Sequence, residues 1–274
     1  MTNSLSIAIA GAAGRMGRQL IATSIAANHQ ITGGTESAQS PSLKDDLGEL
    51  AGMKPIGLSP VTDVVNAAAT ASVWIDFTTP AATLAALESL RHTGVHAVII
   101  GTTGFSETEE NTIRKAAEHF AIVKAGNFSL GVTLMTALTK LAASRLGADW
   151  DIEILETHHR RKLDAPSGTA LMLGDAAAEG RGHSLSDLRA APYDGPKAKR
   201  ETGAIGFSVR RMGDVIGEHE VALGSEKELL KIGHVALDRS VFAEGALEAA
   251  RWAMTAKPGF YDMNAVLDLS LIHI

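Results

Sequence analysis

The sequence contains no cysteine among its 274 residues. Disulfides, thiolate metal sites and a cysteine nucleophile are therefore excluded, and the absence is typical of a protein that works in a reducing compartment. Aromatic residues make up only 4% of the chain, and the formal net charge is −6. Both features argue against a nucleic-acid-binding surface. We expect a cytoplasmic protein with no nucleic-acid partner.

Long hydrophobic runs are also missing. No apolar stretch approaches the roughly 20 residues that a membrane-spanning helix requires. The first ten residues lack a cationic segment, and their apolar run leads directly into a glycine-rich turn, so we do not expect a signal peptide. The sequence predicts a protein with no membrane association.

Glycine is abundant, with 27 residues, and hydrophobic residues make up 45% of the chain. In the first half, short apolar runs alternate with helix-like segments, which indicates a Rossmann-like, doubly wound parallel sheet of the α/β class. Capping signals support two of the helices, Thr79-Pro80 before one and Ser106 to Glu109 before the next. The expected strands are 5–10, 30–35, 72–77, 95–100 and 121–124, and the expected helices are 18–27, 61–69, 80–91 and 107–119.

The pattern changes after residue 128. A helix over 129–146, a strand over 151–157 and a helix ending near 178 are followed by a polar loop over 180–202. Three further strands, 207–211, 218–223 and 228–236, predict an antiparallel meander. With the strand 151–157 they predict a smaller α+β domain with a mixed, partly antiparallel sheet. A helix over 239–256 and the tail after it are expected to return to the first domain.

The glycine-rich turn has the spacing Gly-x-x-Gly-x-x-Gly, at Gly11, Gly14 and Gly17. It follows the first strand and opens a helix, an arrangement that lets a pyrophosphate approach the helix N-terminus. Glu36 ends the second strand, where a ribose hydroxyl is read in dinucleotide sites. The alternatives are a tight turn that only packs helix on strand, and a solvated loop carboxylate at Glu36.

A carboxylate at the ribose repels a 2′-phosphate, so Glu36 and the neutral Ser37 favour NADH over NADPH. Arg15, Arg18 and Lys44 are weak candidates for reading the extra phosphate. Two later turns, 101–104 and 126–128, follow strands of the same sheet, and ligands of open α/β sheets bind at such strand ends. Either segment is also readable as a simple turn.

A run of basic or titratable side chains, residues 158–162, stands out in an acidic protein and precedes a helix start at Ser167. A helix N-terminus favours anions, so the two features together predict a pocket for a small acidic molecule. A solvated basic surface is the alternative. Neighbouring residues of a strand point to opposite faces, so His158 and His159 do not suit one metal, and no metal site is expected. The chain also lacks a Gly-x-Ser-x-Gly elbow, which argues against hydrolysis.

These motifs resemble those of the 4-hydroxy-tetrahydrodipicolinate reductase family, also called dihydrodipicolinate reductases. The resemblance extends from about residue 5 to 269 and is most specific at residues 156–170, Glu-Thr-His-His-Arg-Arg-Lys-Leu-Asp-Ala-Pro-Ser-Gly-Thr-Ala. It implies reduction of a cyclic dicarboxylate by NADH or NADPH to tetrahydrodipicolinate, in lysine and diaminopimelate biosynthesis. It also implies a homotetramer that is built through the smaller domain.

The resemblance further implies site residues. His158 and Lys162 match the proton-transferring pair. The positions that hold the substrate carboxylates are His159, Ser167, Gly168 and Thr169. The positions that contact the cofactor are Gly11, Ala12, Ala13, Gly14, Arg15, Met16, Glu36, Gly101, Thr102, Thr103, Ala125, Gly126, Asn127 and Phe128.

Two positions depart from the family pattern. Ser37 stands where some members have arginine, which argues against a strong NADPH preference, and Gly126 stands where some have alanine. The segment 270–274 matches nothing in the family, and Arg160 and Arg161 have no assigned role.

The expected domains are 1–128 with 240–274, which bind the dinucleotide, and 129–239, which binds substrate and mediates oligomerisation. The active site is expected between them, with hinges near 128–129 and 238–240. Two alternatives stay open: another NAD(P)-dependent dehydrogenase of a small acidic substrate, and a noncatalytic dinucleotide-binding regulator.

Overall fold

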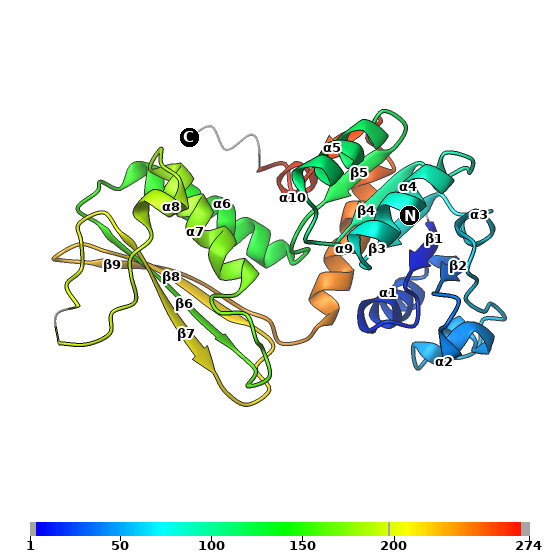
Figure 1. Ribbon diagram of the computed structural model, residues 1–274, viewed down its shortest axis with the longest axis horizontal. Coiled ribbons are helices and arrows are strands. Elements are labelled where there is room, and N and C mark those ends of the chain that lie inside the picture. Colours follow the sequence, from blue (N-terminus) through cyan, green and yellow to red (C-terminus); the bar gives the residue numbers. More distant parts are fainter. Residues whose placement is uncertain (1–3, 197, 270–274) are drawn as a thin grey trace. The chain divides into compact units, whose positions relative to one another are not determined.

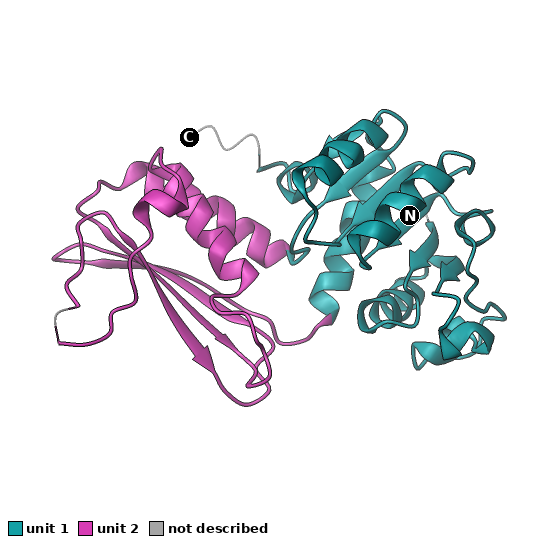
Figure 2. Ribbon diagram, in the orientation of Figure 1, with its two compact units in different colours: residues 1–129, 240–274 teal, residues 130–239 magenta. Residues whose placement is uncertain are grey.

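The computed structural model describes residues 4–196 and 198–269. They form two compact units (Figure 2), and the chain leaves the first unit after Ser129 and returns to it at Ser240. Within the described residues, none of the helices has the length and apolar character that crossing a membrane requires. The segment 270–274, which resembles nothing in the family, lies outside the described residues.

The first unit is built on a six-stranded parallel sheet (Figure 1). Its strands follow the order β10-β5-β4-β3-β1-β2, so the chain runs outward from β1 in both directions, which is the predicted doubly wound arrangement. The strands are β1 (Ser6–Ala10), β2 (Gln30–Thr35), β3 (Val73–Asp76), β4 (Ala97–Ile100), β5 (Ala121–Lys124) and β10 (Gly259–Tyr261). The return of the C-terminal segment to this unit is confirmed by β10, which pairs with β5.

Four longer helices and several short ones accompany this sheet. The longer ones are α1 (Arg15–Ala26), α4 (Pro80–Leu90), α5 (Glu107–Ala116) and α9 (Ser240–Ala253), and the short ones are η1 (Pro41–Lys44), α2 (Leu47–Leu50), α3 (Val64–Ala67) and α10 (Met263–Val266). Every residue of β3 and β4 is buried, as expected of parallel strands covered on both faces. Each fully buried aliphatic side chain there contributes roughly 1.5–3 kcal/mol.

The helix starts read from the sequence are confirmed. Thr79 caps α4, its hydroxyl accepting from the N–H of Ala82. At α5 the capping box is complete, because the N–H of Ser106 donates to Glu109 at 2.7 Å and the N–H of Glu109 donates back to the hydroxyl of Ser106 at 3.4 Å. Such local signals need no tertiary partner, which is why the sequence reveals them.

The predicted helix over residues 61–69 is wrong in extent, since only Val64–Ala67 is helical. Val61 instead continues the edge beside β2: its N–H donates to the carbonyl of Gly34 at 2.9 Å, and its carbonyl accepts from the N–H of Glu36 at 3.0 Å. Asp63 then caps the short helix through the N–H of Asn66. Backbone pairing at a sheet edge has overridden the helical pattern.

The second unit contains a four-stranded sheet in the order β7-β6-β8-β9. Its elements are α6 (Leu130–Arg145), β6 (Asp151–His158), α7 (Gly168–Gly180), α8 (Leu185–Leu188), β7 (Ile205–Arg211), β8 (Glu218–Gly224) and β9 (Leu229–Val235). The mixed sheet is as predicted, but the three-strand meander is wrong. Strand β6 lies between β7 and β8, parallel to one and antiparallel to the other. The helix α7 makes the connection from β6 to β7 a crossover, which requires parallel pairing.

The loop predicted over residues 180–202 also contains the short helix α8, so that prediction is wrong there. Ser184 is the N-cap of this helix, and its hydroxyl and N–H both donate to the carboxylate of Asp187. Alternate residues of β6 are buried on one face of the sheet, and the core on that face includes residues of α6 and α7. Ile152 and Ile154 occupy this row first, and Glu156 and His158 end it. The buried apolar face of β6 therefore ends in a pair of buried polar side chains.

Candidate functional site

The end of β6 holds a carboxylate and an imidazole on the same face, because Glu156 and His158 are two residues apart on a strand. Glu156 is 1% exposed and His158 is 8% exposed. Oε2 of Glu156 accepts a hydrogen bond from Nδ1 of His158. A buried charge is expensive without partners, so the surroundings of Glu156 decide whether it stays ionised.

Arg211, at the end of the neighbouring strand β7, donates to both oxygens of Glu156 at 2.8 Å. The N–H of Ser167 adds a third donor, at 3.0 Å from Oε1. Burial by itself would raise the pKa of Glu156, but these hydrogen bonds and the one from His158 outweigh it and lower the pKa. Glu156 is thus a fixed, ionised carboxylate beside the histidine.

A second histidine, His219, lies opposite Glu156 on β8. Its ring meets that of His158 edge to face, with 5.1 Å between the centroids. Its Nε2 lies 3.2 Å from the hydroxyl oxygen of Ser167, which also accepts from the N–H of Ala170 at 3.2 Å. Burial, with a smaller contribution from the charge of His158, lowers the pKa of His219 to about 4. His219 is therefore neutral near pH 7 and tied to the start of α7.

The loop between β6 and α7 carries the remaining basic side chains. The ammonium of Lys162 forms an ion pair with Asp164 at 2.9 Å. The exposed Arg161, which the sequence left without a role, pairs with Asp214 in the turn after β7 at 2.6 Å. Burial lowers the pKa of His158, Glu156 opposes this, and the positive charges of Lys162 and Arg211 lower it further. Lys162 therefore acts on the same imidazole as the buried cluster.

The residues that the sequence predicts to bind the substrate differ in how far they are buried. Ser167 is buried and caps α7, and Gly168 and Thr169 are the first two residues of that helix. His159 follows the end of β6 and is partly exposed, and its Nδ1 is buried without a hydrogen-bond partner in the described residues. Sequence reasoning missed three members of the cluster, Glu156, Arg211 and His219. Only the first had a local signal, its position two residues before His158.

In the first unit, the glycine-rich turn packs helix α1 directly on strand β1. Gly11 has a positive φ of +61°, and its carbonyl accepts from the N–H of Gly14 at 2.9 Å. A Cβ on Gly17 would lie 2.2 Å from that same carbonyl oxygen. The turn therefore needs glycine for packing, and α1 begins beside it with no capping side chain on Gly14.

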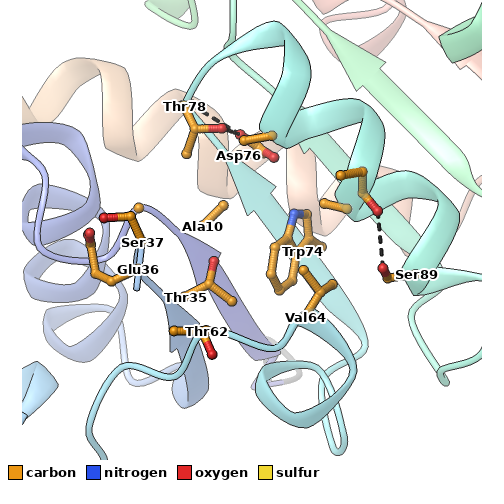
Figure 3. A pocket seen from close by; sticks show the side chains of 14 residues that line it. Ala10, Thr35, Glu36, Ser37, Thr62, Val64, Trp74, Asp76, Thr78 and Ser89 are labelled. Atoms are coloured by element: carbon orange, nitrogen blue, oxygen red, sulfur yellow. Dashed lines mark hydrogen bonds between the residues drawn. The ribbon is translucent and has the colours of Figure 1, made fainter. Parts of the chain in front are cut away.

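Glu36 is bound to this turn, because its Oε1 accepts from the N–H of Ala13 at 2.8 Å. Beside it lies a cavity of about 390 Å³ (Figure 3). Trp74 and Asp76 contribute buried polar atoms, Nε1 and Oδ2, that have no hydrogen-bond partner among the described residues. The lining residues are Ala10, Gly11, Thr35, Glu36, Ser37, Thr62, Val64, Trp74, Asp76, Thr78, Ala82, Ala85, Ala86 and Ser89.

The later strand ends are more buried than the sequence implied. Thr102 is 3% exposed and its hydroxyl donates to Asp76 at 3.2 Å, so its side chain is engaged within the unit. Phe128 is 1% exposed and packs against Phe77, with 5.4 Å between ring centroids. A Cβ on Gly101 would meet the Phe77 ring at 2.0 Å. The segments that directly follow β3, β4 and β5 thus pack against one another.

Comparison with known proteins extends over nearly the whole chain. Residues 5–128 match the family model of the dihydrodipicolinate reductase N-terminus, and residues 131–267 match that of the C-terminus. The chain is 50% identical over 273 residues to the 4-hydroxy-tetrahydrodipicolinate reductase of Parvibaculum lavamentivorans, covering 98% of this chain and 100% of the relative. It is 49% identical to that of Sinorhizobium fredii, covering 97% and 98%.

A solved structure is similar in fold. The dipicolinate-bound dihydrodipicolinate reductase from Paenisporosarcina sp. TG-14 aligns with a TM-score of 0.73 and 25% identity, covering 95% of this chain and 98% of that one. An amine dehydrogenase from Mycobacterium smegmatis aligns with a TM-score of 0.64 at 14% identity, which indicates a common fold only.

Proposed function

The chain belongs to the 4-hydroxy-tetrahydrodipicolinate reductase family, and from this premise we propose how its two units divide the reaction. The protein is an NAD(P)H-dependent oxidoreductase of lysine biosynthesis. In our proposal the unit with the parallel sheet binds the dinucleotide, and the unit with β6 binds the dicarboxylate and supplies the proton. The observation that carries this assignment is the buried cluster of Glu156, His158 and Arg211 beside the start of α7.

The cofactor fits the first unit. The turn from Gly11 to Met16 offers backbone N–H groups at the start of α1 for the pyrophosphate, and Glu36 offers a carboxylate for the ribose. The adjoining cavity has apolar walls, and the unpartnered polar atoms of Trp74 and Asp76 suit a flat, polar ring such as adenine. When bound, the reduced nicotinamide supplies the hydride.

We further propose a preference for NADH. Ser37 is exposed, lines the cavity beside Glu36 and carries no charge for a 2′-phosphate. Replacing Ser37 by arginine should raise the ratio of kcat/KM for NADPH to that for NADH about tenfold, because one well-placed ion pair with a phosphate contributes about 1.4 kcal/mol. The measurement is the initial rate of NADH or NADPH oxidation, with substrate generated by the upstream synthase from pyruvate and aspartate semialdehyde.

Ser37→Ala is the matched control, since it changes the same exposed position without adding charge. Its cofactor ratio should equal that of the unchanged protein. An unchanged ratio in Ser37→Arg would refute the proposed role of the Glu36-Ser37 pair.

The substrate site is proposed at the start of α7. Its N-terminal backbone at Gly168 and Thr169 favours a carboxylate, and His159 and Lys162 add positive charge nearby. A relative has been solved with dipicolinate bound, and this planar dicarboxylate is a suitable probe. A Cβ on Gly168 would meet no atom within 4 Å, so that position opens onto free space.

Replacing Gly168 by alanine should leave the fold intact and weaken dipicolinate binding about tenfold, because the new methyl group occupies the space where a carboxylate would lie. Isothermal titration with dipicolinate measures the loss, and thermal unfolding verifies the fold. Gly94→Ala is the matched control, because a Cβ there also meets no atom within 4 Å and lies in the other unit. Equal affinities in the two variants would exclude this site.

The proton in this proposal comes from His158, which is suited to acid–base work near neutral pH, with Lys162 acting beside it. The ammonium of Lys162 is paired with Asp164, and its charge lowers the pKa of the imidazole. The start of α7 holds the ring of the substrate in place, a contribution of orientation and electrostatics.

Self-association is the last part of the proposal. Core residues of α6 and α7 pack on one face of the second sheet, whereas the other face exposes apolar side chains, including Leu229 at 68% and Val235 at 55%. This face also carries a groove of about 170 Å³ lined by residues of β6, β7, β8 and β9, with the charged side chains of Arg210, Glu218 and Glu220 among them. We infer that further copies of the chain cover this face in a homotetramer, and that the enzyme works in the cytoplasm with the cofactor pool there.

A further inference from the structure

We propose that Glu156, held by Arg211, is a positioning residue that fixes the ring of His158 through Nδ1 and leaves Nε2 as the nitrogen that releases the proton. This inference rests on the proposed role of His158 and adds to it the residue that aims the imidazole. Glu156 touches neither substrate nor cofactor in this proposal, and its effect passes through His158.

Both carboxylate oxygens of Glu156 are held in place. Its Oε1 accepts from Arg211 and from the N–H of Ser167, and its Oε2 accepts from Arg211 and from His158. Arg211 is itself anchored, since it also donates to the carbonyl of Asp164 at 2.6 Å. A bidentate guanidinium on a 1%-exposed carboxylate fixes both its position and its ionisation. The imidazole therefore meets a rigid acceptor.

The hydrogen bond to Glu156 decides which ring nitrogen of His158 carries the hydrogen. An ionised carboxylate only accepts hydrogen bonds, so Nδ1 of His158 must be the protonated nitrogen in the neutral ring. The proton that the imidazolium can release is then the one on Nε2. Holding one ring nitrogen in this way selects the tautomer of the other, which is how carboxylates act on histidines in metal and acid–base sites.

A glycine lies beside Nε2 of His158. A Cβ on Gly217 would lie 3.1 Å from Nε2 of His158 and 3.7 Å from Cε1 of His219. Any side chain at this position would press on the nitrogen. The glycine before β8 therefore spares Nε2 the close contact that any side chain there would make, while Nδ1 is held by Glu156.

The proton balance follows directly. During reduction, the N–H bond at Nε2 of the imidazolium breaks, and the proton forms a new bond on the substrate that has received the hydride. The electron pair stays on Nε2, so the ring becomes neutral and keeps its Nδ1–H on Glu156. Solvent returns the proton to Nε2 afterwards.

Charged and titratable groups face His158 from each neighbouring segment: Glu156 on its own strand, Arg211 on β7, His219 on β8, and Lys162 in the loop before α7. Burial lowers the pKa of His158, and among these groups Glu156 is the one that raises it, whereas Lys162 and Arg211 lower it. Removing Glu156 and removing Arg211 should therefore move this pKa in opposite directions.

The test is ¹⁵N NMR of the full chain labelled at histidine, with the signal of His158 identified by its loss in His158→Gln. In the unchanged protein the neutral ring should show a protonated Nδ1 and an unprotonated Nε2. Glu156→Gln should lower the pKa of His158 by about 1 unit, because a nearby opposite charge shifts a pKa by roughly 1–3 units. It should also allow the second tautomer. Arg211→Met should raise the same pKa.

The double variant Glu156→Gln/Arg211→Met removes both charges together and keeps the test valid if either single variant unfolds. It should mix the two tautomers while the pKa stays closer to that of the unchanged protein than in either single variant. In parallel, the pH dependence of kcat is measured. The pKa at which kcat declines on the alkaline side should fall in Glu156→Gln by the same amount as the pKa measured by NMR.

The outcomes separate the two proposals. If Glu156→Gln keeps both the Nδ1–H tautomer and the pKa of His158, or if the double variant keeps the Nδ1–H tautomer, the positioning role is overturned, whatever the turnover. If the tautomer and pKa change as expected but His158→Gln turns over normally, the positioning stands and the proton-donor role fails.

Discussion

Replacing His158 by glutamine should lower kcat about a hundredfold and leave the fold intact. Loss of a positioned acid–base group costs 10²–10⁴-fold, and a hundredfold loss corresponds to about 2.7 kcal/mol of transition-state stabilisation. Glutamine approximates the size of the ring and can still bond to Glu156, so the buried carboxylate keeps its partners. The measurement is NADH oxidation at saturating substrate, and dipicolinate titration verifies that the substrate site survives.

His183→Gln is the matched control, because His183 is an exposed histidine of the same unit, outside the cluster at the end of β6. Its kcat should equal that of the unchanged protein. If His158→Gln also keeps normal turnover, His158 does not supply the proton, and Lys162 becomes the first group to test.

Replacing Gly17 by alanine should weaken the binding of both NADH and NADPH at least tenfold and destabilise the first unit. The new Cβ would stand 2.2 Å from the carbonyl oxygen of Gly11 and 2.7 Å from that of Ala12. Both contacts are with backbone, which cannot turn aside, so α1 must move off the turn. Overpacking of this kind costs roughly 1–3 kcal/mol, and we expect at least a tenfold loss of cofactor affinity.

Alanine substitutions at two other glycines serve as controls for this result. A Cβ on Gly14 would lie 3.1 Å from the same Gly11 carbonyl, so Gly14→Ala should show a smaller loss, and Gly94→Ala, which meets open space, should show none. Isothermal titration with NADH and thermal unfolding give the two readouts. Full cofactor affinity in Gly17→Ala would mean that the turn is packing alone and holds no dinucleotide.

Features carried by neighbouring residues were predictable from the sequence. The capping box at Ser106 and Glu109, the cap at Ser167 and the glycine turn at Gly11 each depend on a few adjacent side chains and on backbone geometry. The alternation of strands and helices in the first unit, which sets a parallel sheet, is equally local in origin. These signals correctly predicted the class of the fold and the helix start beside His158.

The order of the strands in the second sheet could not be predicted from the sequence. Strands β7, β8 and β9 follow one another closely along the chain, and that spacing suggested a meander. Strand β6 lies between β7 and β8 because α7 crosses the sheet and returns the chain parallel to β6. The choice between these arrangements depends on which faces become buried together, and a short apolar run does not carry that information.

The longer helices and strands, the glycine turn and the place of His158 before a helix start could be read from the sequence, because each follows from residues a few positions apart. The surroundings of that histidine depend on the tertiary fold. Arg211 lies 55 residues from Glu156 in the chain, and the hydroxyl of Ser167 reaches His219 across 52 residues. The cost of burying Glu156 is offset only when such distant donors converge on it, and their convergence is set by strand pairing, which no local pattern encodes.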